Sequence, residues 1–177
     1  MCEICDGKTE EEIFDTMNAR VAARGWTLQG VEPRQHGSGW VYSIGLIENF
    51  DSAELVVTGV GLEHGSGLLS EICERIADGL RIEAGDALDL DGYVFEFEAV
   101  HPSYIAHDLF ASWVRYYRRI GEPPGPLRVL QVVVPAAGLC DHCVQKRDCL
   151  TVPGTREFSG GLNRAERRAR ARRQGRR

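Results

Sequence analysis

The sequence contains no run of apolar residues that approaches the roughly 20 needed to span a bilayer as a helix. Its first residues are acidic and cysteine-bearing, whereas a secretory signal begins with basic and then apolar residues. These absences predict a cytoplasmic protein with no membrane partner. In that reducing compartment, cysteines are expected as metal ligands, reactive thiols or small buried groups instead of disulfides.

A complete catalytic signature is also missing. Residues 59–67 place glycines after an expected strand and before an expected helix, a setting in which backbone amides can hold phosphate. The segment lacks the Gly-Lys-Ser/Thr of a P-loop, and its glycines lack the full spacing of a dinucleotide-binding loop. A flexible turn is therefore the more ordinary interpretation. If the turn binds an anion, the expected donors are Ser66 and the amides near Gly65 and Gly67, with His64 at the rim.

The sequence does contain six cysteines. Four of them form two Cys-x-x-Cys pairs at opposite ends of the sequence, namely Cys2 with Cys5 and Cys140 with Cys143. Each pair can offer two thiolates to one ion from a single tight turn. The spacing therefore predicts a structural zinc site with four thiolate ligands that ties the two ends of the domain together.

Two alternatives to zinc stay open. Cys149 adds a third thiol to the second pair within ten residues, and five candidate ligands also suit an iron–sulfur cluster. Either pair is also compatible with a redox dithiol, in which a reactive thiol lies at a helix N-terminus, and Cys2 and Cys5 do precede an expected helix. Cys73 is different, because it lies on the apolar stripe of another expected helix and is predicted to be buried.

The order of elements predicts an α+β fold with about three helices. A capping box formed by Thr9 and Glu12 starts a helix over 9–24, and Gly25 is placed to end it. Further helices are expected over 65–77 and 104–120. Segments rich in Val, Ile, Thr and aromatic residues predict strands over 26–31, 40–46, 54–60, 87–91, 93–100 and 127–134. The last strand is the most apolar, which places it centrally in a mixed or mainly antiparallel sheet.

Charge divides the chain into two parts. The formal net charge is −5, yet residues 163–177 hold eight arginines against one glutamate, so the rest of the chain is strongly acidic. We predict a globular domain over 1–152 and an Arg-rich tail over 153–177, which is disordered or a solitary helix because it has almost no apolar face to bury. From Arg164 to Arg177 the tail is expected to be a solvated appendage, an RNA-binding arm that contacts phosphates, or a helix for a partner protein.

Three strings in the sequence are similar to those of one known family: Trp40-Val-Tyr-Ser-Ile-Gly-Leu46, Ala53-Glu-Leu-Val-Val-Thr-Gly59 and Leu130-Gln-Val-Val-Val-Pro135. In this order, over roughly residues 2–135, the chain resembles the bacterial and phage family called domain of unknown function 4262. Ser43 stands where that family often has threonine, and Ala53 where it often has proline. The resemblance implies a shared fold and a bacterial or phage origin. It implies no reaction, and it does not carry a metal role for the thiols after Pro135.

The first two strings are expected to form paired strands, with Tyr42, Ser43 and Glu54 as the polar groups that meet across the pairing. The ordinary interpretation is that Glu54 accepts hydrogen bonds from nearby backbone or hydroxyl donors. The alternative is a small enzyme that uses Glu54, Tyr42 and His64 for acid–base chemistry in a pocket beside the 59–67 turn. We favour the first interpretation, and with it a noncatalytic, zinc-stabilised binding module whose small-molecule ligand, if any, is unknown.

Overall fold

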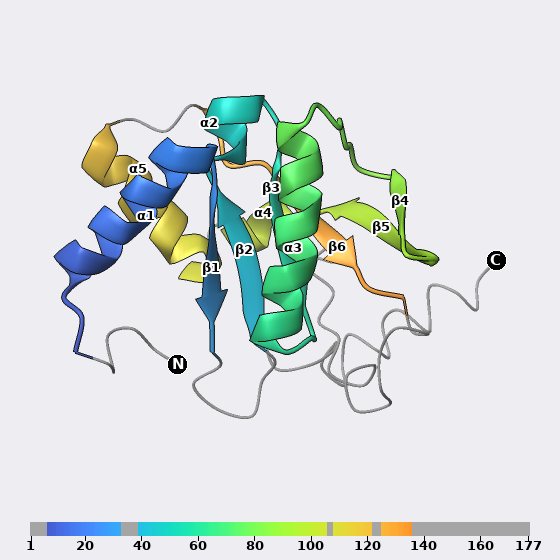
Figure 1. The fold of residues 1–177 in the computed structure, drawn as a ribbon, viewed down its shortest axis with the longest axis horizontal. Helices are drawn as coiled ribbons and strands as arrows, with labels where there is room; N and C mark the ends of the chain where they lie inside the picture. Colours follow the sequence, from blue (N-terminus) through green and yellow to red (C-terminus); the bar gives the residue numbers. More distant parts are fainter. Residues whose placement is uncertain (1–6, 33–38, 106–107, 122–124, 136–177) are drawn as a thin grey trace.

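A computed structural model describes residues 7–32, 39–105, 108–121 and 125–135 (Figure 1). Several predictions concern residues outside these ranges: the thiol pairs Cys2 with Cys5 and Cys140 with Cys143, the alternative ligand Cys149, the domain boundary at 152, and the Arg-rich tail. Within the described ranges, no helix is both long and apolar enough to cross a membrane.

Six strands form one mixed sheet in the order β1-β2-β3-β6-β5-β4. They are β1 (Thr27–Val31), β2 (Trp40–Ile44), β3 (Glu54–Thr58), β4 (Ala87–Leu90), β5 (Tyr93–Ala99) and β6 (Val129–Val133). β3 and β6 pair in parallel, and the other four pairings are antiparallel. The prediction of a mixed sheet with its most apolar strand in the interior is confirmed, since β6 lies between β3 and β5.

The described residues contain five α-helices: α1 (Glu10–Arg24), α2 (Leu46–Phe50), α3 (Leu62–Ala77), α4 (Pro102–Ile105) and α5 (Ala111–Ile120), with a short 3-10 turn at Asp108–Phe110. Both faces of the sheet are covered. On one face α3 packs against β1, β2 and β3 (Figure 1). On the other face, buried residues of α1, α4 and α5 form a second apolar cluster with residues of β2 and β3. The α+β fold class is therefore confirmed.

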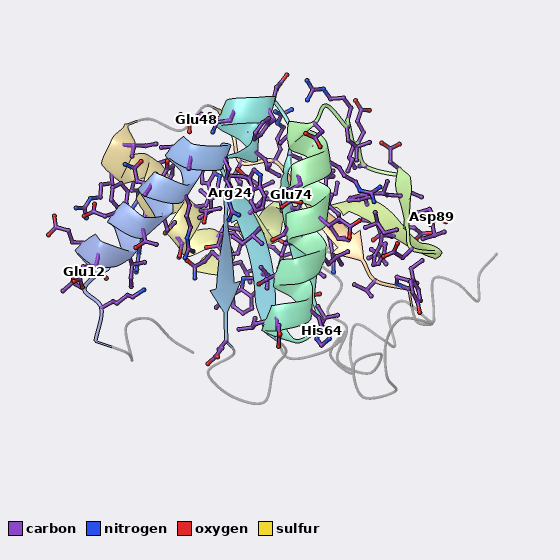
Figure 2. The ribbon with its side chains drawn as sticks, viewed as in Figure 1. Glu12, Arg24, Glu48, His64, Glu74 and Asp89 are labelled. Atoms are coloured by element: carbon purple, nitrogen blue, oxygen red, sulfur yellow. The ribbon has the colours of Figure 1, made fainter. Side chains whose placement is uncertain are left out.

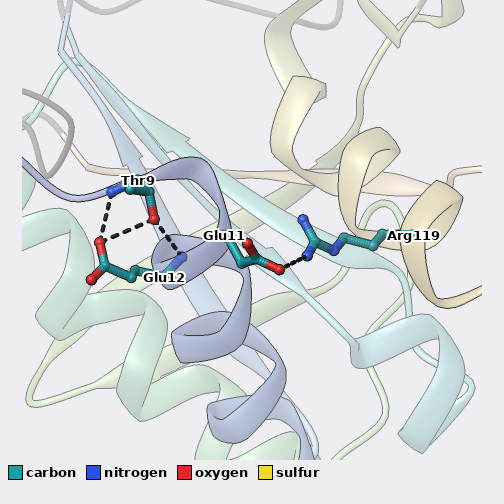
Figure 3. A network of polar contacts seen from close by, with 4 residues as sticks. All are labelled: Thr9, Glu11, Glu12 and Arg119. Atoms are coloured by element: carbon teal, nitrogen blue, oxygen red, sulfur yellow. Dashed lines mark hydrogen bonds and ion pairs between the residues drawn. The ribbon is translucent and has the colours of Figure 1, made fainter.

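The first helix follows local signals closely. Thr9 and Glu12 form the expected capping box: the Glu12 amide donates to Thr9 Oγ1 at 3.2 Å, and the Thr9 amide donates to Glu12 Oε2 at 2.8 Å (Figure 3). These hydrogen bonds lower the pKa of Glu12. At the other end, Gly25 takes a left-handed conformation with φ 83°. Figure 3 also shows the ion pair of Glu11 with Arg119, which joins α1 to α5 at the surface.

Two helix predictions need correction. The helix expected over 104–120 is divided into α4 and α5, because the backbone at Phe110 (φ −112°, ψ 35°) leaves the helical region just before α5. The helix expected from residue 65 begins three residues earlier, at Leu62. Glycine is a poor helix former, but a Cβ on Gly65 would lie only 3.0 Å from Val57 Cγ1. Gly65 is therefore the residue that lets α3 approach the sheet closely.

Cys73 of α3 is fully buried in the apolar cluster beneath that helix, as its position on the apolar stripe predicts. Burial raises the pKa of its thiol well above the ordinary value. A neutral thiol in apolar surroundings is unreactive, so Cys73 belongs to the core and stands apart from the paired cysteines.

Candidate functional site

Glu54 is the only fully buried carboxyl group among the described residues. It is the first residue of β3, and the residues that follow it in this strand are all buried and, apart from Thr58, apolar. Burying a carboxylate is costly unless hydrogen-bond donors replace the lost water. Glu54 and the polar groups around it are therefore the first candidate for a functional site in the described structure.

Four donors from three parts of the chain surround this carboxyl group. Ser43 Oγ, in β2, donates to Glu54 Oε2 at 2.5 Å. The backbone amides of Gly45 and Ile47 donate to Oε1 at 2.9 and 3.5 Å, and the indole Nε1 of Trp113, in α5, donates to Oε1 at 3.3 Å. The carboxyl group thus joins β3 to β2, to the start of α2 and to α5.

The local chain around Ser43 and Gly45 is built to supply these donors. Ser43 Oγ also accepts from the Leu55 amide at 2.8 Å, so the hydroxyl continues the contact between β2 and β3 beyond the last paired residues. Gly45 ends the extended segment with φ 110°, and a Cβ there would lie 2.6 Å from the Gly25 carbonyl oxygen. Only glycine fits this turn, and the turn aims the Gly45 amide at Glu54.

Burial and hydrogen bonding act on Glu54 in opposite directions. Removal from water raises the pKa of its carboxyl group, while the hydrogen bonds from Ser43, Gly45, Ile47 and Trp113 lower it, and the net shift is upward. Burial is also the main reason that the pKa of Tyr117 is raised, with the charge of Glu54 contributing. The site is thus a dry one, in which a negative charge is tolerated at a cost.

Since the pKa of Glu54 is raised on folding, the folded chain holds this proton more tightly than the unfolded chain. The protonated Glu54 carboxyl group therefore contributes to the free energy of unfolding. This contribution is full below the ordinary pKa of 4.5 and is lost as pH rises towards the raised pKa. We expect the stability of the parent chain, relative to Glu54→Gln, to fall over this window. Urea unfolding of both proteins from about pH 4.5 to about pH 7.5 measures it. A constant difference between them would contradict the raised pKa.

Comparison with known protein families assigns the chain to one of them. The family model described as "Domain of unknown function (DUF4262)" matches residues 20–138, about two thirds of the chain. The chain belongs to the DUF4262 family. This confirms the resemblance carried by the three strings, all of which lie inside the matched segment. No curated protein and no solved structure matches the chain.

Within the DUF4262 segment, the Glu54 site connects the first two strings. Ser43 and Gly45 come from the first, and Glu54 and Leu55 from the second. The expected meeting of Ser43 with Glu54 is therefore observed as a direct hydrogen bond. The cysteines of the two Cys-x-x-Cys pairs, Cys149 and the Arg-rich tail lie outside the matched residues, so any role they have is not part of the DUF4262 match.

The other two candidate catalytic residues do not assemble with Glu54. Tyr42 is buried, and its hydroxyl accepts from the Ser112 amide at 3.1 Å. His64 is exposed in the first turn of α3, which follows β3, whereas Glu54 begins that strand. Figure 2 shows His64 at the lower end of α3, whereas Glu48, in α2, lies on the upper side of the molecule. The structure thus separates His64 from the carboxyl group.

The glycine-rich turn of this DUF4262 chain is mostly helix. Gly65, Ser66 and Gly67 lie inside α3, and the Gly65 amide donates to the Gly61 carbonyl at 2.9 Å. That amide, one of the expected anion donors, is therefore already bonded. Among the described residues, no group of three or more His, Cys, Asp or Glu side chains is arranged to hold a metal.

Of the four donors to Glu54, only Ser43 was predicted from the sequence, and the amides of Gly45 and Ile47 and the Trp113 indole were missed. A buried indole N–H needs an acceptor, and this need is the signal that could have pointed from Trp113 to a polar partner. Ile47 gave no signal, because its amide becomes available only when the chain turns into α2.

Proposed function

We propose that this DUF4262 protein is a noncatalytic binding module. The observation that carries the proposal is the enclosure of Glu54, whose side chain is fully buried and surrounded by four protein donors. An acid–base catalyst has to reach the proton that it transfers. A groove of about 460 Å³ is present nearby, and its lining includes Ser52 and Ala53 but not Glu54. The carboxyl group is therefore better explained as a structural link.

The module is stabilised by one zinc ion held by Cys2, Cys5, Cys140 and Cys143 in the reducing cytoplasm. The support is the spacing of the cysteines, because each Cys-x-x-Cys pair can offer two thiolates to one ion from a single tight turn.

The partner of the module is RNA, bound by the Arg-rich segment from Arg164 to Arg177. The support is the charge distribution: the arginines are concentrated in this segment, whereas the rest of the chain is acidic and so unsuited to phosphate contact over a broad face. Without interleaved aromatic residues, the segment offers contacts to phosphates and not to bases. We therefore expect RNA binding with little dependence on base sequence.

Deletion of residues 163–177 is expected to abolish this binding and to leave folding intact. The measurement is fluorescence anisotropy of a labelled single-stranded RNA titrated with the full chain and with the truncated chain. Neutralising about four phosphates gives a salt slope near −3, so the affinity of the full chain should drop about fiftyfold between about 50 and about 200 mM salt.

The matched control for this experiment is Arg75→Gln, which removes a surface arginine on α3 and leaves the tail unchanged. Its RNA affinity should equal that of the parent. Undiminished binding by the truncated chain, or an affinity that does not respond to salt, would place the RNA contact elsewhere and overturn the proposal. Capture of a protein in place of RNA would identify the tail as a partner helix.

A further inference from the structure

The groove near the Glu54 site lies at the end of the sheet where the parallel strands β3 and β6 begin. Its volume, about 460 Å³, is within the range of small-molecule sites in proteins. Much of its wall is apolar, with contributions from Ala53, Val100, Ile105, Leu127 and Val129. Neither the family match nor the proposed RNA contact assigns a role to this groove, and its role is therefore independent of both.

One polar group in this wall has no partner. Ser52 lines the groove and is only 5% exposed, and its hydroxyl makes no hydrogen bond. A buried hydroxyl without a partner is unfavourable, and native structures contain few of them. The Ser52 hydroxyl is therefore available to a polar atom of a molecule bound in the groove.

Four charged residues line the groove, and two of them neutralise each other. Arg128 Nη2 lies 3.0 Å from Asp51 Oδ1. The other two, Arg81 and Glu83, form no side-chain ion pair with a described residue. Arg81 Nη1 donates to the Phe50 carbonyl at 2.8 Å, which leaves most of its guanidinium donors unused.

Arg81 and Glu83 flank Ile82, which is buried while both charged residues are exposed. The groove therefore presents one unneutralised positive group and one unneutralised negative group, two positions apart in sequence, beside an apolar wall. A ligand with a single charge satisfies one of these groups and leaves the other unpaired. A ligand that carries both charges close together satisfies both.

We propose that the groove binds a free α-amino acid with an apolar side chain. Its carboxylate pairs with the Arg81 guanidinium, whose forked donors suit a carboxylate. Its ammonium group pairs with Glu83, its side chain lies on the apolar wall, and the Ser52 hydroxyl is the third polar contact.

Three probes of nearly equal size test this assignment by isothermal titration calorimetry on the full chain. Leucine carries both charges, 4-methylpentanoate lacks the ammonium group, and 3-methylbutylamine lacks the carboxylate. Leucine is expected to bind at one site, and each singly charged probe to bind about tenfold or more weakly, because each loses a charge-assisted hydrogen bond.

Two surface variants separate the two charges. Arg81→Gln should weaken leucine about tenfold and remove its advantage over 3-methylbutylamine, whereas Glu83→Gln should remove its advantage over 4-methylpentanoate. Arg75→Gln, on α3 outside the groove lining, should bind leucine like the parent.

Three results would overturn the assignment: no saturable binding of leucine, equal binding of the three probes, or unchanged leucine affinity in both charge variants. Because the RNA assay depends on the tail and this one on the groove, failure of either leaves the other unaffected. Both charged side chains are exposed, so loss of folding does not confuse the outcome.

Discussion

Glu54→Ala is expected to lower the free energy of unfolding by about 3–5 kcal/mol. The substitution removes the acceptor of Ser43, Gly45, Ile47 and Trp113 and leaves these buried donors without a partner. It also opens a cavity at the start of β3, in surroundings that are closely packed. Urea unfolding followed by circular dichroism measures the effect, because the loss concerns the whole fold.

Two variants serve as controls for Glu54→Ala. Glu54→Gln keeps one acceptor oxygen for the donors that converge on Oε1, so a smaller loss of about 1–2 kcal/mol is expected. Glu74→Ala, on the exposed side of α3, should change stability by no more than about 0.5 kcal/mol. If Glu54→Ala were as stable as Glu74→Ala, the carboxyl group would have no structural role, and the case for a catalytic one would be reopened.

The parts of the fold that sequence reasoning predicted correctly are those with a local cause. The cap of α1 depends on Thr9 and Glu12, three residues apart, and its end depends on Gly25. The contact of Ser43 with Glu54 was predicted because the two strands that carry them pair directly. In each case the residues involved are close in sequence or belong to neighbouring strands.

The parts that were missed depend on packing over longer distances. α2 spans only five residues, too few for a helical period to be visible, and it begins where Gly45 turns the chain with a positive φ. Trp113 reaches Glu54 across 59 positions of sequence. The groove is assembled from four separate segments, near residues 51, 81, 100 and 128, so no single stretch of sequence predicts it.

The enclosed carboxyl group also explains why the sequence left the choice between enzyme and module open. A glutamate at the start of an apolar strand is the same pattern whether its environment is a pocket or a sealed core. What distinguishes the two is access, and access depends on Trp113 and α2, which close over Glu54 only in the folded chain. Sequence spacing alone does not contain that information.

Loss of the proposed zinc site is the second large expected effect. Cys143→Ser should lower the free energy of unfolding by several kcal/mol, about 3 or more, because metal binding at a four-thiolate site is coupled to folding. A chelator should destabilise the parent chain by a similar amount and should add little in Cys143→Ser. Elemental mass spectrometry of protein purified without added metal should find one zinc per chain in the parent and none in the variant.

Cys73→Ser is the control that separates a ligand from a buried thiol. It places a hydroxyl in the apolar cluster under α3, so it should destabilise the chain whether or not metal is present, and the chelator should still act on it in full. Iron with sulfide and a brown colour would instead bring Cys149 into the site as part of a cluster. Equal stability of the parent, the chelated parent and Cys143→Ser would exclude a structural metal, and the redox interpretation of the paired thiols would then take its place.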